Sequence, residues 1–434
     1  MRALSFLACA LSLVVGCGGE EESASGLFPA SGFVGRSLRV EVNGDNTSFD
    51  SGTAVSFGPG VTVNEVAISS PTVLFANVTI GDDATAGLND VTVTNDGDTL
   101  TMAAAFELRN PVAITTIGTP AQGGKVSLVI ENLDLENLFD SSVDPQTGLF
   151  NTTATSGAGT TLVINDVTEF EIAATAFFDV DAAPTSVAVI SDGLTSPGGT
   201  LEVEARTAVP IVSGTPATGT LDGSALFEIT ATEAAILAAT IGTSEADVTP
   251  TFDILPASGR WADAGFTHFA TDNTKVAAGD KLYYVVSDAD GLDGYAFQLA
   301  VDEISIDGVT PVAEAEPNNN DNAAQTVAGP LALLGSTLAD DTDLDFYEIT
   351  LTTGQTLTVR TTAGANGGSD TEIAMFDTDG TTELDRVDFD FADTVVFTAP
   401  ADGTYFVTVE PSAFALFFGY APNNDPYDLL ITVE

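Results

Sequence analysis

Short apolar alternations follow one another along most of the chain, separated by Gly, Asp, Asn and Pro. Residues 72–80 (TVLFANVTI) and 89–94 (NDVTVT) place apolar side chains at every second position, and residues 61–68 (VTVNEVAI) do so with one break in the alternation. Side chains alternate between the two faces of a strand, so this period predicts strands with one buried face. Many short strands with turn residues between them are typical of sandwiches. The pattern therefore predicts an all-β protein, built as a string of β-sandwich modules.

Breaks in this pattern divide the chain into an N-terminal segment, a short polar stretch and four modules. The predicted segments are residues 1–16, 17–26, 27–108, 111–210, 213–305 and 313–434. Residues 231–241 could form a helix by composition. Their apolar face is weakly periodic and their neighbours are strands, so we predict a turn and a strand there.

The charge of the chain is strongly one-sided. The 434 residues include 63 Asp and Glu against 11 Lys and Arg, which gives a formal net charge of -52. A polyanion repels phosphates, so nucleic acid is excluded as a partner bound by charge, and cations are favoured. Hydrophobic residues make up 44% and charged residues 17%, so a folded core is expected. With one histidine, His268, and two cysteines, Cys9 and Cys17, the chain lacks the residues for an HExxH zinc site or a Cys/His zinc cluster.

The N-terminal segment has the profile of a signal peptide. Arg2 precedes an apolar run, residues 3–15, that is too short to span a bilayer. The sequence VVGC at residues 14–17 resembles the lipobox of bacterial lipoproteins, which implies cleavage before Cys17 and acylation of that residue. We therefore expect an exported, lipid-anchored protein at the outer membrane or cell surface. Residues 17–26 would be a flexible tether. An ordinary secretory signal with an accidental cysteine is the alternative.

The first and the fourth module each contain sequence motifs that resemble those of a known domain family. FDSGTAVSF at residues 49–57 and TAGLNDVTVTN at residues 85–95 resemble the IPT/TIG immunoglobulin-like domain, which implies an Ig-like sandwich over 27–108. VNEVA at residues 63–67 lines up with INDVT at residues 164–168, so we expect residues 111–210 to be a second Ig-like module, a decayed copy of the first. EAEPNNN at residues 314–320, DLDFYEITL at 343–351 and APADGTYFVTV at 399–409 resemble the bacterial pre-peptidase C-terminal (PPC) domain. This domain is a jelly-roll-like sandwich related to collagen-binding modules of secreted collagenases. Residues 213–305 look like a divergent relative without the opening acidic segment.

The fourth module contains the one acidic cluster that we predict to bind a metal. Resemblance to the PPC domain implies that two segments meet around Ca²⁺, through Glu314, Glu316, Asn318, Asn319, Asp341, Asp343 and Asp345. Ca²⁺ takes 6–8 oxygen ligands, which carboxylates and amides on turns provide. Packed carboxylates also repel each other unless a cation neutralises them. The alternative is a solvated acidic linker followed by an acidic turn.

Two other motifs are weaker. Asp50-Ser51-Gly52 resembles the catalytic motif of aspartic proteases, but no second copy exists at a comparable position, so we interpret it as a turn. Trp261 and His268 could form a stacking surface for a sugar or peptide, and a buried tryptophan with a satisfied histidine is the favoured interpretation.

These observations favour a non-enzymatic surface protein. Its candidate partners are extracellular matrix, a glycan or another surface protein, besides the membrane reached through Cys17. The alternative is an extracellular hydrolase of polysaccharide or protein, or its accessory subunit, using an acidic pair that sequence alone cannot identify. A structural spacer with no ligand except calcium is the third hypothesis.

Overall fold

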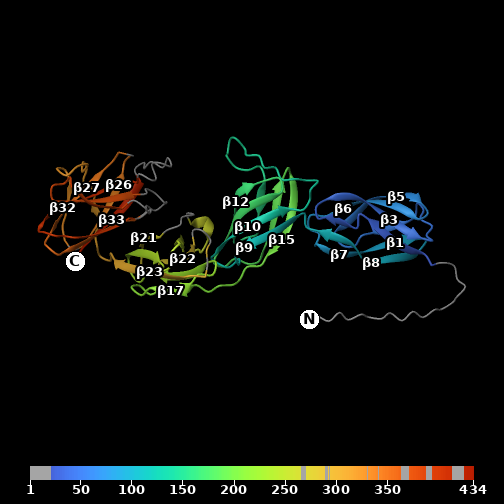
Figure 1. The fold of residues 1–434 in the computed structure, drawn as a ribbon, viewed down its shortest axis with the longest axis horizontal. Helices are drawn as coiled ribbons and strands as arrows, with labels where there is room; N and C mark the ends of the chain where they lie inside the picture. The colour runs from blue at the N-terminus through green and yellow to red at the C-terminus, as the bar shows by residue number, and fades with distance from the viewer. Residues whose placement is uncertain are drawn as a thin grey trace.

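The computed structural model describes nine parts of the chain: residues 21–264, 270–288, 292, 294–329, 331–340, 342–362, 371–387, 393–412 and 425–434. These residues form strands in eight sheets and one 3-10 turn, η1 (Trp261–Asp263), with no α-helix among them. No described helical segment is long and apolar enough to cross a membrane. The eight sheets pair into four sandwiches that follow one another in a row (Figure 1). The predicted all-β string of sandwiches is therefore confirmed.

The first module is a sandwich of two four-stranded sheets, with strand orders β1-β3-β6-β5 and β2-β8-β7-β4. Their bounds are β1 (Ser23–Phe28), β2 (Ser31–Phe33), β3 (Ser37–Asp45), β4 (Ala54–Ser56), β5 (Val61–Ser70), β6 (Val73–Ile80), β7 (Gly87–Asn95) and β8 (Asp98–Arg109). Phe57 and Phe106 are fully buried in its core, with ring centroids 5.0 Å apart. The predicted tether, residues 17–26, is too long: β1 already pairs with β3 at Ser23, because Ala24 packs against the core.

The second module pairs a four-stranded sheet, β12-β13-β10-β9, with a three-stranded sheet, β11-β14-β15. Their bounds are β9 (Val112–Ile117), β10 (Lys125–Asn132), β11 (Thr153–Thr155), β12 (Thr160–Val167), β13 (Glu171–Phe178), β14 (Thr185–Ser191) and β15 (Leu194–Leu201). Leu128, Ile130 and Phe178 lie in the core between the sheets. The connection from β10 to β11, residues 133–152, projects from one end of the sandwich (Figure 1).

The third module pairs the sheets β16-β18-β22-β20 and β17-β23-β19-β21. Their bounds are β16 (Val209–Pro210), β17 (Ala217–Thr220), β18 (Ala225–Thr230), β19 (Ala235–Gly242), β20 (Pro250–Leu255), β21 (Thr271–Val276), β22 (Lys281–Asp288) and β23 (Ala296–Ser305). β19 confirms the predicted strand within residues 231–241. β16 lies inside the range predicted for the second module, 111–210, but belongs to the third because it pairs in parallel with β18.

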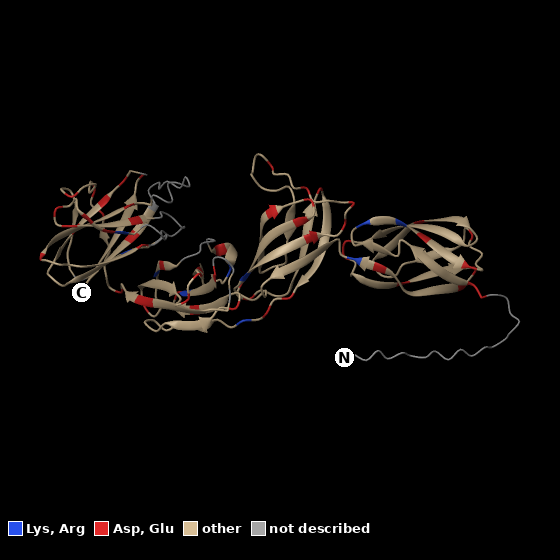
Figure 2. Ribbon diagram, viewed as in Figure 1, with Lys and Arg blue, Asp and Glu red and all other residues tan. Residues whose placement is uncertain are grey.

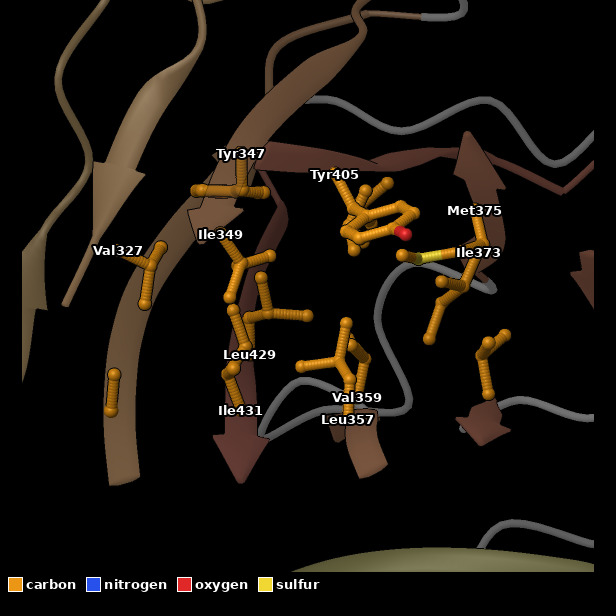
Figure 3. Close-up of a cluster of buried hydrophobic side chains, with 14 of the residues drawn as sticks. Val327, Tyr347, Ile349, Leu357, Val359, Ile373, Met375, Tyr405, Leu429 and Ile431 are labelled. Carbon is orange, nitrogen blue, oxygen red and sulfur yellow. The ribbon is translucent and has the colours of Figure 1, made fainter. Parts of the chain in front are cut away.

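The fourth module pairs two five-stranded sheets, β24-β26-β33-β28-β31 and β25-β27-β32-β29-β30. Their bounds are β24 (Val312–Ala313), β25 (Gln325–Val327), β26 (Leu331–Leu338), β27 (Asp345–Leu351), β28 (Thr356–Thr362), β29 (Thr371–Phe376), β30 (Glu383–Val387), β31 (Thr394–Thr398), β32 (Gly403–Pro411) and β33 (Asp425–Val433). Alternate residues of these strands fill one buried cluster, in which Figure 3 shows Ile349, Val359 and Met375. β27 and β33 in this sandwich carry residues of the candidate site described below.

Three of the 11 basic residues join neighbouring modules. Arg36 of the first module lies 2.7 Å from Asp134 of the second, Lys125 of the second 3.0 Å from Asp253 of the third, and Lys275 of the third 2.7 Å from Asp428 of the fourth. Figure 2 shows acidic residues spread over all four modules and blue positions that are rare. The modules are negatively charged and repel one another, and each of these ion pairs provides a local attraction between two neighbours.

Arg36→Ala is expected to loosen the first junction. The guanidinium also donates to the Ser196 hydroxyl at 2.8 Å and to the Thr195 carbonyl at 3.1 Å, all in the second module. Loss of these charge-assisted hydrogen bonds should weaken the association of the first and second modules by about 1.5–3 kcal/mol. Small-angle scattering should show a more flexible chain. Arg39→Ala is the matched control, because Arg39 lies over the Phe75 ring within the first module; equal flexibility in both variants would contradict the assignment.

Candidate metal centre

The candidate site lies where the chain enters the fourth module. β24 pairs in parallel with β26, and the Glu314 amide donates to the Gly335 carbonyl at 3.3 Å. Four residues later, the Asn318 carbonyl accepts a hydrogen bond from the Phe346 amide at 2.9 Å, next to the start of β27. The opening acidic segment is therefore held against two strands, one from each sheet. This brings together residues that are about thirty positions apart in the sequence.

Three carboxylates converge there. Ligand oxygens of Glu314, Glu316 and Asp345 all lie within 4.8 Å of one another, and this is the one such group found among the described residues. Glu316 is exposed, Glu314 is half-buried and Asp345 is fully buried. The site is therefore open to water at Glu316 and closed at Asp345, so an ion could enter it from solvent.

Asn318 completes this group. Its side-chain amide donates to Glu314 Oε1 at 3.2 Å, and its backbone amide donates to Glu316 Oε2 at 3.0 Å. Asn318 is fully buried, and among the described residues its Oδ1 has no hydrogen-bond partner; the same holds for Asp345 Oδ1. A buried oxygen without a partner costs on the order of 1–3 kcal/mol. Two of them in one acidic cluster fit a site whose missing partner is a cation.

Tyrosines form the base of the site. Tyr427 on β33 donates its hydroxyl to Asp345 Oδ2 at 2.6 Å, and the Tyr427 and Tyr347 hydroxyls are 3.1 Å apart. Tyr347 is also 2.8 Å from the Ser336 hydroxyl. This chain of hydrogen bonds holds Asp345 Oδ2 in place, whereas Asp345 Oδ1 takes no part in it. The sequence does not mark Tyr427 and Tyr347 as site residues, because their alternate positions within apolar strands are those of ordinary core residues.

The surroundings strongly disfavour the charged form of Asp345. Burial raises the pKa of its carboxyl to about 9, and Glu314 and the charge of Asp343 act in the same direction, whereas the hydrogen bond from Tyr427 lowers it. Burial likewise raises the pKa of Tyr427 well above its ordinary value. Burial therefore favours the protonated form of Asp345 as long as no cation is bound.

The affinity of this site for a divalent cation is expected to rise with pH. The folded-state pKa of Asp345 lies above its ordinary value of 3.8, so its protonation stabilises the cation-free fold at low pH, and that contribution is lost as pH rises through about 9. A cation must displace this proton, so the dissociation constant for Ca²⁺ should fall up to about tenfold per pH unit. Titration calorimetry at pH 6, 7 and 8 measures it. A dissociation constant independent of pH would show that no proton is displaced.

The other predicted ligands occupy the adjacent turn or lie outside the described residues. Asp343 accepts hydrogen bonds from the Asn319 side chain at 2.9 Å and from the Ala339 amide at 2.7 Å. Asn319 and Asp343 are therefore bonded to each other and shape the turn before β27. Asp341 and the predicted lipid-attachment residue, Cys17, lie outside the described residues.

The donor set consists of oxygen alone. The four converging side chains, Glu314, Glu316, Asn318 and Asp345, offer six carboxylate oxygens and one amide oxygen. Hard cations prefer such ligands, and Ca²⁺ tolerates the irregular geometry that carboxylates and an amide produce, whereas Mg²⁺ demands a near-ideal octahedron. The residues present therefore fit Ca²⁺.

The two weaker motifs are not sites in the described structure. Asp50 Oδ1 accepts the Gly52 amide at 2.7 Å, which makes an ordinary Asx turn. Trp261 is fully buried, which agrees with the favoured interpretation and leaves no stacking surface. His268 lies outside the described residues.

Comparison with known families supports part of the sequence interpretation. Residues 343–411 match the bacterial pre-peptidase C-terminal domain. The match begins at Asp343 and covers β27 and most of the sandwich behind the site, whereas the acidic segment with Glu314 lies before it. The resemblance of residues 27–108 to IPT/TIG domains and the lipobox at Cys17 stay predictions. A search among curated proteins finds no match to the sequence.

Solved structures with local similarity are β-rich proteins of several kinds. The periplasmic lysozyme inhibitor PliG of Aeromonas hydrophila is 20% identical and covers 26% of this chain and 96% of its own, with a TM-score of 0.21. SGBP-B from the mixed-linkage glucan utilization locus of Bacteroides ovatus is 10% identical, covering 92% of this chain and 97% of its own (TM-score 0.20). The Escherichia coli adhesin FdeC is 16% identical, covering 65% and 96% (TM-score 0.18). These values are too low to transfer a ligand or an activity.

Proposed function

We propose that the chain is a lipid-anchored, non-enzymatic surface protein that binds a partner outside the cell and holds Ca²⁺ in its fourth module. The observation that carries the calcium assignment is the pair of buried, unpartnered oxygens on Asn318 and Asp345, beside the carboxylates of Glu314 and Glu316. A bound cation supplies the missing partner for both oxygens and neutralises the carboxylates around them.

Calcium at this position has a mechanical role. The ligands join the segment that follows β24 to the first residue of β27, and β24 directly follows the linker from the third module. Bound Ca²⁺ therefore fixes the chain where it enters the fourth sandwich. The ion stiffens the last junction of the rod and orients the terminal module toward its partner.

The anchor is tested by a pair of cysteine variants. Cys17→Ala should move the protein from the membrane fraction to the soluble fraction and abolish incorporation of radiolabelled palmitate. Cys9→Ala is the matched control, because Cys9 lies in the apolar run and is removed with the signal peptide. Palmitate incorporation that survives Cys17→Ala would contradict the lipobox assignment.

Binding is tested with the soluble chain that starts after Cys17. We expect it to bind one or more members of a panel of glycans, matrix proteins and surface proteins, more tightly in calcium than in EGTA. Deletion of residues 314–434 should abolish that binding. Hydrolysis of a glycan or protein by the purified chain, lost on changing a single Asp or Glu, would overturn the non-enzymatic assignment.

A further inference from the structure

A polar hollow lies at the junction of the first and second modules. Its volume is about 420 Å³, and Arg36 of the first module contributes to its lining. The second module provides the rest of the lining: Glu136, Asn137, Leu138, Phe139, Glu169, Ser191, Asp192, Leu194 and Ser196. The Phe139 amide donates to the Glu169 carbonyl at 3.1 Å, and the Asp140 amide donates to the Ser191 hydroxyl at 2.8 Å. Hydrogen bonds thus tie the three lining segments into one wall.

The charge of this hollow is negative. Arg36 is 12% exposed and is already neutralised by Asp134, whose carboxylate is 5% exposed. The lining carboxylates of Glu136, Glu169 and Asp192 are exposed, and among the described residues none of the three forms an ion pair. Three uncompensated carboxylates around one concave surface favour a cationic occupant.

Exposed apolar side chains belong to the lining segments or directly adjoin them in sequence. Leu194 belongs to the lining and is 37% exposed, Leu135 lies between Asp134 and Glu136 and is 69% exposed, and Phe170 follows Glu169 and is 54% exposed. Exposed large apolar side chains beside a concave surface are typical of interaction sites. They contribute binding free energy when a partner covers them.

These features together select one class of occupant. Nucleic acid and anionic lipid carry charge of the wrong sign, and a second copy of this chain would bring another -52 charges. A hollow of about 420 Å³ accommodates a few side chains, which a protruding loop can insert. We propose that this junction binds a cationic loop of another protein, in which Lys or Arg alternates with apolar residues. The proposal gives the chain a second binding surface, separate from the one assigned to residues 314–434, and rests on the surface location proposed above.

A synthetic peptide in which lysine and leucine alternate is the probe, titrated into the soluble full chain by fluorescence anisotropy. We expect saturable binding that weakens about tenfold in roughly 0.5 M NaCl, because salt screens the charges. Peptides that alternate lysine with serine, or glutamate with leucine, should bind at least about tenfold more weakly. Equal binding of the three peptides would overturn the proposal.

Two multiple variants locate the site. Leu135→Ser with Phe170→Ser, and Glu136→Gln with Glu169→Gln and Asp192→Asn, should each weaken binding about tenfold without changing the melting temperature, because all five side chains are exposed. Unchanged binding by both variants would overturn the proposal.

The matched controls change other exposed residues of the same chemical types. They are Ile117→Ser with Val163→Ser, and Glu21→Gln with Glu22→Gln and Asp45→Asn. Both should bind the peptide as the original chain does, and a loss equal to that of the test variants would contradict the location. Failure of this proposal is distinguishable from failure of the proposed function, because calcium binding and binding that depends on residues 314–434 are measured independently.

Discussion

Asp345→Asn is expected to abolish the rise in melting temperature that calcium gives the fourth module. An ion that binds only the folded state stabilises it by about 4 kcal/mol when its concentration is about a thousand times the dissociation constant. The asparagine would keep the shape of the side chain and its contact with Tyr427, but it would remove the buried negative charge from the ligand set. Differential scanning calorimetry of the full soluble chain in millimolar CaCl₂ and in EGTA measures the effect.

The calcium-free form gives the control for this variant. Because burial raises the pKa of the wild-type Asp345 carboxyl and so disfavours its charged form in the fold, the asparagine variant should be at least as stable as the wild type in EGTA. Asp385→Asn, an exposed change on β30 of the same module, should keep the full response to calcium. A calcium-dependent rise that survives Asp345→Asn would contradict the assignment of this residue as a ligand.

Trp261→Ala is expected to have the largest effect on the junction between the second and third modules. Trp261 in η1 packs against Phe177 of the second module, with centroids 4.9 Å apart, and its Nε1 donates to the Phe178 carbonyl at 2.9 Å. Its backbone amide donates to Asp179 at 3.0 Å. Truncation to alanine leaves a cavity and an unsatisfied carbonyl, at a cost of about 3–5 kcal/mol.

Calorimetry and small-angle scattering measure this loss together. In the wild type, the second and third modules should melt as one cooperative unit, whereas Trp261→Ala should separate their transitions and increase the flexibility of the chain. Trp261→Phe keeps most of the ring and removes only the Nε1 hydrogen bond, so its effect should be smaller, about 1–3 kcal/mol. Identical melting of the alanine variant and the wild type would show that the modules are not coupled through this residue.

The strands were predictable because their signal is local. β6 and β19 follow from alternation, neighbouring turns and the rejection of a weakly periodic helix, all within short stretches of sequence. The approach of Glu314 and Asp345 came from resemblance to the PPC domain, with the repulsion of clustered carboxylates as support. The role of Tyr427 was not predictable, since it donates to Asp345 across 82 positions of sequence. The length of the tether was not predictable for the same reason, because it is set by the packing of Ala24 against the core of the first module.

The ion pairs between modules were not predictable from the sequence either. Arg36 and Asp134 are 98 positions apart, and Lys125 and Asp253 are 128 apart. Nothing local in the sequence distinguishes these basic residues from Arg39. Only the order of the modules in space shows that Arg36, Lys125 and Lys275 join neighbouring sandwiches, which is consistent with a polyanionic chain that still forms a continuous rod.

Direct measurement of bound metal tests the calcium centre most simply. The soluble chain is dialysed against micromolar CaCl₂, passed through a desalting column and analysed by mass spectrometry for metal per chain, beside Asp345→Asn and Asp385→Asn. We predict that the wild type and Asp385→Asn retain calcium and that Asp345→Asn retains one ion fewer per chain. A wild type without bound calcium, or the same calcium content in all three proteins, would contradict the account.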